Sequence, residues 1–181
     1  MRSSHASSTR TSSARAEPAW FALHTRARSE RKVVRALERR DIRCFFPVVR
    51  RKRRWHDRNK LLSCPLFPGY VFARVDASAL PALARIDGVA DFVRFGERPA
   101  LIHDDEIDNM LRFAGALNEK GGEAARVPYT DGARVRIAAG PWSGLEGVVV
   151  DAGEPARVII GIPTIGMGFE VEVFRKSLTV S

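Results

Sequence analysis

The side chains of this sequence that are best suited to chemistry are cations. Between residues 20 and 60 there are fifteen Lys and Arg against four Asp and Glu, so this stretch carries +11, while the whole chain of 181 residues carries +9. Such a local excess suits a partner with a dense run of negative charge, above all the phosphates of a nucleic acid. The alternative is a solvated arginine-rich surface without a partner. The candidates for phosphate contact are Arg26, Lys32, Arg35, Arg39, Arg50, Arg51, Lys52, Arg53 and Arg54.

Groups that would support catalysis or metal binding show no matching pattern. The four histidines lack the spacing of metal ligands, and no HExxH, P-loop or GxSxG motif occurs. Cys44 and Cys64 lie far apart and flank apolar segments, which favours buried thiols over a redox pair or a zinc site. We therefore predict no catalytic residues, no metal, no cofactor and no enzymatic activity.

Composition sets the class of protein. A hydrophobic content of 45% is normal for a chain that folds around a core. Two cysteines exclude a disulfide scaffold, and no apolar run approaches the roughly 18 residues that cross a bilayer. We expect a cytoplasmic protein with no membrane partner.

The first part of the chain alternates strand and helix patterns. Residues 1–18 are rich in Ser and Arg and are expected to be a disordered tail. Residues 19–117 follow the order β-α-β-β-α-β-α, which predicts an α+β sandwich with a mainly antiparallel sheet. Its last helix begins near Asp104, the expected N-cap. The segment 50–60 is expected to be a basic loop or hairpin tip.

The last part of the chain has a different pattern. Residues 118–128 contain Gly121 and Gly122 and no apolar period, so they are predicted to be a linker. Residues 129–181 hold eight of the fourteen glycines and five short strand patterns. A small five-stranded barrel is expected there. Because glycine and proline interrupt it so often, we expect a barrel in all states rather than a helical hairpin.

Several motifs occur in an order that is known from one family. They are PLFPGYVF at residues 65–72, FVRFG at 92–96, and GPWSGLEG at 140–147, with Trp20 and Phe21 at the start of the first strand. Together they resemble the NusG family, which joins an N-terminal NGN domain to a C-terminal, SH3-like KOW domain. The segment from Trp55 into PLFPGYVF is similar to specialised paralogs of the RfaH and UpxY type.

The resemblance implies that the NGN domain binds the clamp helices of the RNA polymerase β′ subunit. The residues at the matching positions are Trp20, His24, Phe67, Pro68, Gly69 and Tyr70. Phe67 and Tyr70 flank a Pro-Gly turn, where large rings can point outward as interface anchors. The alternative is that both rings belong to the core. His24 stands where RfaH-type proteins carry an aromatic residue.

The resemblance also implies two further partners. The basic helix face that carries Arg26 and Lys32 matches the region where the RfaH type touches exposed DNA, either the non-template strand or upstream DNA. The KOW domain would bind ribosomal protein NusE or Rho through Trp142, Leu145 and Ile165. The alternative is that these three apolar side chains only cap the barrel.

The function expected from the resemblance is that of a bacterial transcription elongation factor. It would suppress pausing and termination as a specialised antiterminator, and would reach the nucleoid through RNA polymerase. Two alternatives stay open: a housekeeping NusG that couples polymerase to Rho or the ribosome, and a KOW-type ribosome- or RNA-binding protein with no polymerase contact.

Overall fold

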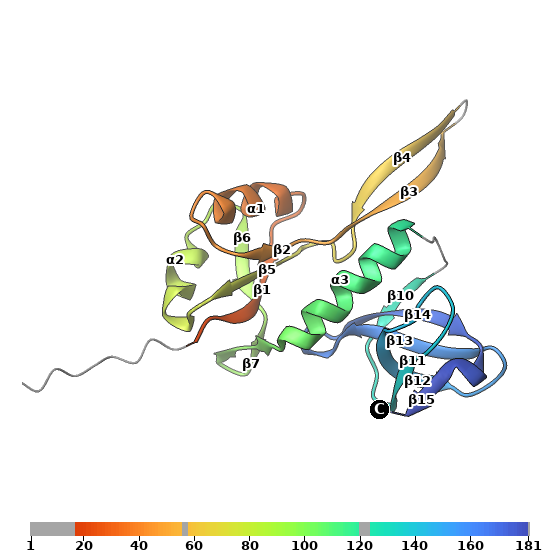
Figure 1. Cartoon of the computed structure of the whole chain (residues 1–181). Coiled ribbons are helices and arrows are strands. Elements are labelled where there is room, and N and C mark those ends of the chain that lie inside the picture. Colours follow the sequence, from red (N-terminus) through yellow and green to blue (C-terminus); the bar gives the residue numbers. More distant parts are fainter. Residues whose placement is uncertain (1–16, 56–57, 120–123, 181) are drawn as a thin grey trace, which may run out of the picture.

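The computed structural model describes residues 17–55, 58–119 and 124–180, with side chains outside 51–61. Its elements mix helices with antiparallel sheets, which confirms the α+β class. The N-terminal domain and the C-terminal domain lie side by side, and one long helix runs between them (Figure 1). Within the described residues no helix is long and apolar enough to span a membrane.

The N-terminal domain is organised around its first strand. This strand, β1 (Ala19–Thr25), pairs antiparallel with three others, and β2 extends the sheet beyond β5. The three partners of β1 are β5 (Tyr70–Val75), β6 (Val89–Phe92) and β9 (Leu101–Ile102), and β2 is Cys44–Phe45. β1 is central because six of its seven residues are at least half-buried, so both sheet faces are covered.

Alternate residues of β1 face different helices. Phe21 and Leu23 pack with α1 (Glu30–Glu38) and α2 (Leu80–Ala84), which follows a short 3-10 turn at Ala77–Ala79. α1 buries Val33, Ala36 and Leu37, spaced i, i+3, i+4, and exposes its cations.

The opposite sheet face is covered by the long helix α3 (Asp104–Glu119), which packs against Trp20 and Ala22. Asp104 is a helical residue here rather than the expected N-cap. Its carboxylate accepts hydrogen bonds from Trp20 Nε1 at 2.8 Å and Arg74 Nη2 at 3.2 Å, so it ties the helix to the sheet.

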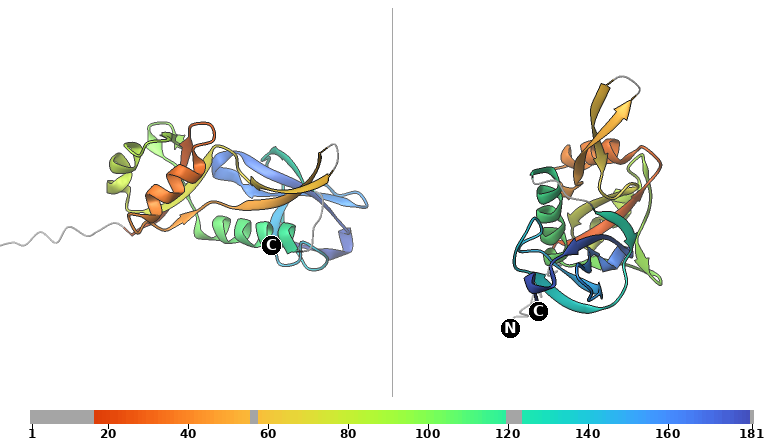
Figure 2. Two further views of the ribbon diagram at one scale, coloured as in Figure 1. Left: turned by 90° about the horizontal axis from the view of Figure 1, so that it is seen from above. Right: turned by 90° about the vertical axis from the view of Figure 1, so that its right-hand side faces the viewer.

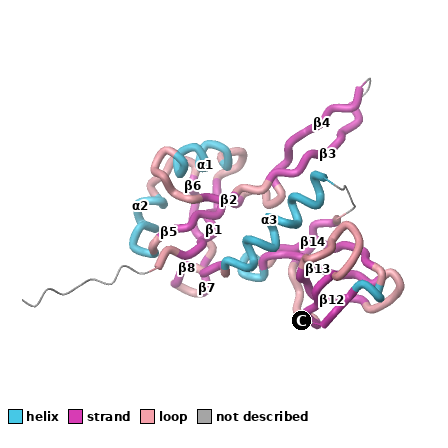
Figure 3. Tube along the Cα trace, viewed as in Figure 1, coloured by secondary structure: helices cyan, strands magenta, loops and turns pink. Residues whose placement is uncertain are grey.

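Two hairpins leave the N-terminal sheet. The longer one joins β3 (Val48–Trp55) to β4 (Arg58–Pro65) and projects away from the body of the molecule (Figure 3). We call β3 and β4 the basic hairpin, because the cations from residue 50 onward lie on it. The shorter one joins β7 (Arg94–Phe95) to β8 (Arg98–Pro99).

The C-terminal domain is an antiparallel sheet in the order β10-β14-β13-β12-β11-β15. Its strands are β10 (Ala125–Pro128), β11 (Ala133–Ile137), β12 (Glu146–Asp151), β13 (Ala156–Ile162), β14 (Met167–Val173) and β15 (Leu178–Val180). Short 3-10 turns at Pro163–Ile165 and Arg175–Ser177 lie between strands. The sequence predicts strands at residues 134–137, 147–150, 157–162, 169–173 and 178–180, and β11 to β15 match these to within two residues at each end. We call this curved sheet the barrel (Figure 2).

The sixth strand, β10, comes from residues that the sequence assigned to the linker. β10 pairs with β14, and α3 continues to Glu119, so the part of 118–128 between these two elements is short. The linker pattern lacked an apolar period because β10 is a largely exposed edge strand.

Candidate functional site

The Pro-Gly turn at residues 67–70 has the geometry that the sequence predicts. The Tyr70 N–H donates to the Phe67 carbonyl at 3.2 Å, and Gly69 has a φ of +84°, which a type II turn with Pro68 before it requires. The turn also binds α1, since the Glu30 carboxylate accepts the Gly69 N–H at 2.9 Å. The Pro-Gly turn therefore lies against the N-terminal end of α1, the helix with the exposed cations.

One side of this turn faces outward. Pro68 and His24 are exposed, and Tyr70 is half-buried. The rings of His24 and Tyr70 lie 5.3 Å apart between centroids, and His24 is opposite Tyr70 in the β1–β5 register. These three side chains form the exposed surface that we call the turn surface.

The Phe67 side chain does not point outward, and this corrects the expectation for that residue. Its exposed fraction is 0%, and it makes edge-on contacts with Phe72 and with Phe169, at centroid distances of 5.6 and 5.4 Å. Phe169 belongs to β14 of the barrel. Phe67 is thus covered by the other domain. Trp20 is buried as well, because its indole packs in the same core and donates to Asp104.

The apolar residues that were expected to form an open partner surface on the barrel are covered too. Trp142 and Leu145 are 3% and 2% exposed, and Ile165 is half-buried against the same core. The Trp142 ring lies 5.3 Å from Phe113 of α3 between centroids. Phe113 also contacts Phe169 at 5.2 Å. Phe67, Trp142 and Leu145, which the sequence assigned to separate partners, are thus buried in one core that both domains share.

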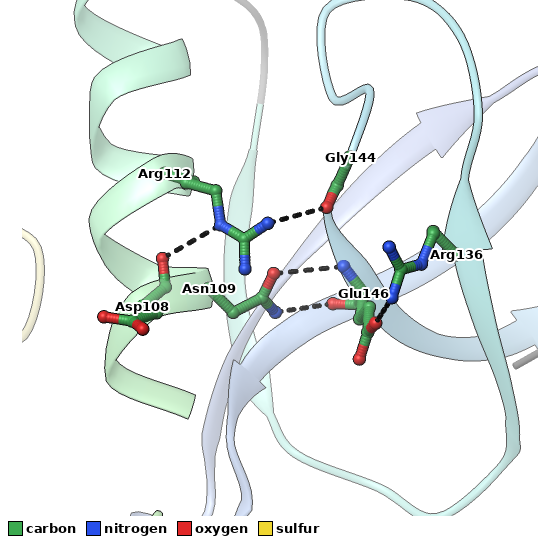
Figure 4. Close-up of polar contacts among 6 residues, drawn as sticks. All are labelled: Asp108, Asn109, Arg112, Arg136, Gly144 and Glu146. Carbon is green, nitrogen blue, oxygen red and sulfur yellow. Dashed lines mark hydrogen bonds and ion pairs between the residues drawn. The ribbon is translucent and has the colours of Figure 1, made fainter. Parts of the chain in front are cut away.

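Polar contacts fix the register of this interface (Figure 4). The Asn109 side chain donates to the Glu146 carbonyl at 2.7 Å and accepts the Glu146 N–H at 3.0 Å. Arg112 donates to the Gly144 carbonyl at 3.3 Å. Asn109 is buried, so both of its amide groups need a partner, and the backbone of Glu146 supplies both.

A polar cavity of about 310 Å³ adjoins these contacts. It lies between the N-terminal turns of α3 and the barrel, and its lining includes Glu106, Asn109 and Tyr129. Burial raises the pKa of the Glu106 carboxyl above its ordinary value, although a hydrogen bond from the Thr164 hydroxyl at 3.3 Å acts the other way. Burial likewise raises the pKa of Tyr129. The interface therefore holds a carboxyl and a phenol whose ionisation is less favourable than it is in water.

The cations in and beside α1 form an exposed surface next to the turn surface. Arg26, Lys32, Arg35 and Arg39 are all exposed. Lys32 pairs with Asp87, and that hydrogen bond, together with the charge of Lys32, lowers the pKa of Asp87. Arg50 is exposed at the base of the basic hairpin, whereas the side chains of Arg51, Lys52, Arg53 and Arg54 lie outside the described part of the chain.

Sequence reasoning missed the polar residues that join the domains. Asn109 lies between the apolar positions Ile107 and Met110 on the buried stripe of α3, where an amide has no place in a simple core. That position was the available signal. Arg112 and Thr164 gave no signal, because an exposed arginine and a threonine in a turn are common.

Comparison with known proteins gives the family. The family model described as "Transcription termination factor nusG" matches residues 18–111, which is more than half of the chain and includes the whole N-terminal domain up to α3. This chain belongs to the NusG family. It is therefore a NusG-type transcription factor.

Relatives within the NusG family cover nearly the full length. The Transcription termination/antitermination protein NusG of Thermus thermophilus is 28% identical over 173 residues, with 85% of this chain and 94% of the relative covered. The protein of the same name from Borreliella burgdorferi is 21% identical over 178 residues, with 86% and 94% covered. A solved structure titled "Domain interaction in Thermotoga maritima NusG" is 24% identical, with 91% and 97% covered and a TM-score of 0.47.

Proposed function

We propose that this NusG-family chain is an elongation factor that binds RNA polymerase through the turn surface and contacts DNA through its exposed cations. It would suppress pausing and termination in the manner of a specialised antiterminator of the RfaH and UpxY type. The β′ clamp helices are the proposed site on polymerase. Family membership supports a role in transcription, and the motifs at residues 65–72 and 92–96 favour the specialised type.

The observation that carries the proposal is the hydrogen bond between Glu30 and the Gly69 N–H. It holds the Pro-Gly turn against the start of α1, so that exposed His24 and Pro68 border the cations of that helix. A protein contact and a phosphate contact can then be made by one continuous surface. The cations Arg26, Lys32, Arg35 and Arg39 would neutralise phosphates without reading sequence.

The buried Phe67 adds a condition to this proposal. If Phe67 is a polymerase contact, the barrel must first leave it, because Phe169 covers its ring. Trp142 and Leu145 would become available to NusE or Rho in the same step. The docked arrangement is therefore proposed to be a closed form, and the separated domains the active form.

The test is binding to purified bacterial RNA polymerase core enzyme, followed by a single-round elongation assay. Four proteins are compared: the wild type, a His24→Ala/Tyr70→Ala variant, an Asn109→Ala/Arg112→Ala variant that weakens the closed form, and an Arg85→Ala control. Arg85 is exposed at the end of α2 and outside the proposed surface. Circular dichroism and thermal unfolding confirm that each variant folds.

We expect the turn-surface variant to lose binding and the Asn109→Ala/Arg112→Ala variant to bind more tightly than the wild type. The control should match the wild type. Equal binding by the turn-surface variant would refute the polymerase-binding surface. No binding by any protein, together with co-purification with ribosomal RNA, would favour the KOW-type ribosome-binding alternative.

Rescue of a NusG depletion by this chain would favour the housekeeping role over the specialised one.

A further inference from the structure

α3 carries two asparagines that each bind the backbone of a strand. Asn109 binds both backbone groups of Glu146 at the start of β12 in the barrel. Asn118 accepts the Arg50 N–H at 2.8 Å and donates to the Val48 carbonyl at 3.0 Å, both in β3 of the basic hairpin. The two asparagines are nine residues apart, which is two and a half helical turns, so they lie on opposite sides of α3.

The contact of Asn118 completes an edge of the hairpin. β3 pairs with β4 along one edge, with Val49 opposite Cys64. Because backbone groups of successive residues point to opposite edges of a strand, the N–H and C=O groups of Val48 and Arg50 point away from β4. One side chain amide supplies the acceptor for Arg50 and the donor for Val48, as a neighbouring strand would. The Asn118 side chain thus occupies the edge of β3 that faces away from β4.

Apolar packing joins the same three parts. Val49 at the hairpin base, Ala114 and Phe113 of α3, and Phe169 of the barrel belong to one contiguous buried cluster. Figure 1 shows the C-terminal end of α3 next to the base of the hairpin and its length alongside the barrel. A rigid helix that is packed on both sides is a physical route for coupling between the two sides.

We propose that α3 couples the barrel to the basic hairpin, and that Asn118 is the positioning residue that holds the hairpin base. With the barrel docked, Asn109 and Phe113 hold α3, and Asn118 fixes β3. When the barrel leaves, one side of α3 loses its packing, and the hairpin base becomes looser. The direction of the hairpin would then depend on whether the barrel is docked. The consequence for DNA rests on the proposed function, whereas the coupling itself does not.

The coupling is measured at a single atom, the Arg50 amide proton, by hydrogen exchange followed by NMR in the full-length protein. The variants are Asn118→Ala, Asn109→Ala, and Glu119→Ala as an exposed control on the same helix. We expect exchange of the Arg50 amide about tenfold faster in Asn118→Ala, because its acceptor is removed. We expect at least threefold faster exchange in Asn109→Ala, although residue 109 lies on the other side of the helix, and no change in Glu119→Ala.

A conservative variant separates a hydrogen bond from a loss of fold. Asn118→Asp keeps the acceptor for the Arg50 N–H but loses the donor to the Val48 carbonyl, so the Arg50 amide should exchange more slowly than in Asn118→Ala. If Asn118→Ala leaves the Arg50 amide unchanged, the positioning role is wrong. If Asn118→Ala acts but Asn109→Ala does not, the coupling is wrong.

The DNA arm uses fluorescence anisotropy with a labelled duplex at several salt concentrations. Replacing Arg51 to Arg54 by serine should weaken binding and reduce the salt slope, and Asn118→Ala should weaken binding severalfold without removing a charge. If the serine variant binds DNA as the wild type does, the proposed DNA contact of the hairpin fails, and hydrogen exchange alone decides the coupling. If the serine variant weakens binding but Asn118→Ala does not, the positioning of the hairpin for DNA is refuted.

Discussion

The ring of Phe67 lies edge-on to the ring of Phe169, with centroids 5.4 Å apart and planes at 70°. The first residue comes from the Pro-Gly turn of the N-terminal domain and the second from β14 of the barrel. Edge-to-face pairs of this kind add to the free energy of burial itself. Because of this contact, the Phe67 ring becomes accessible to a partner only when β14 of the barrel moves away from it.

The first prediction concerns this aromatic contact. Phe67→Ala should lower the free energy of unfolding by about 3–5 kcal/mol, because it empties a fully buried site that both domains line. Tyr70→Ala should cost less, since Tyr70 is half-buried. Urea unfolding followed by circular dichroism measures both. Equal losses of unfolding free energy in the two variants would contradict the burial of Phe67.

The second prediction concerns the amide between the domains. Asn109→Ala removes two hydrogen bonds between the buried Asn109 side chain and the backbone of Glu146. The N–H and C=O groups of Glu146 then lose the amide that satisfies them. We expect a loss of about 1–3 kcal/mol in the unfolding free energy. Asp108→Ala, an exposed neighbour, should change it by less than about 0.5 kcal/mol. If both variants lost the same unfolding free energy, helix propensity and not the hydrogen bonds to Glu146 would explain the loss.

The third prediction concerns pH. Because burial raises the folded-state pKa of Glu106 above its ordinary 4.5, its contribution to stability is fully present below that value and is lost as pH rises through the folded-state pKa. Relative to Glu106→Gln, the wild type should therefore lose unfolding free energy as pH rises above 4.5.

His103 lowers the pKa of the Glu106 carboxyl and Asp105 raises it, so a substitution at each of these two positions serves as a control. Urea unfolding of the wild type and of Glu106→Gln at intervals between pH 4 and 8 gives the difference curve. Parallel curves would mean that ionisation of Glu106 does not weaken the interface.

The fourth prediction compares two glycines. Gly115 lies in α3 with nothing within 4 Å of a built Cβ, so Gly115→Ala should stabilise the protein by about 0.5–1 kcal/mol. At Gly161 in β13 a Cβ would collide with the Met167 carbonyl oxygen, so Gly161→Ala should disrupt the pairing of β13 with β14. Thermal unfolding measures both. A stabilised Gly161→Ala protein would contradict the close approach of these strands.

The sequence by itself determined the three α-helices, the α+β class and five strands of the barrel, but it did not predict β4, β8, β9 or β10. The spacing of Val33, Val34 and Leu37 predicted a helix there with its cations on the other face; in the structure Val33 and Leu37 are buried together with Ala36, whereas Val34 is half-buried. The glycine-punctuated strands of the barrel were predicted to within two residues. These features depend on local periodicity, which the chain carries in every state. The Pro-Gly turn was also predictable, because Gly69 must adopt a positive φ there.

Only the tertiary structure decided what each surface faces. Phe67 and Trp142 have the composition of interface anchors, and local pattern cannot say whether such a ring meets a partner protein or the other half of its own chain. That choice depends on packing between residues about a hundred positions apart, as in the contact of Phe67 with Phe169. The same holds for Asn109 and Asn118, whose partners are strands that only the assembled fold brings to the two sides of α3.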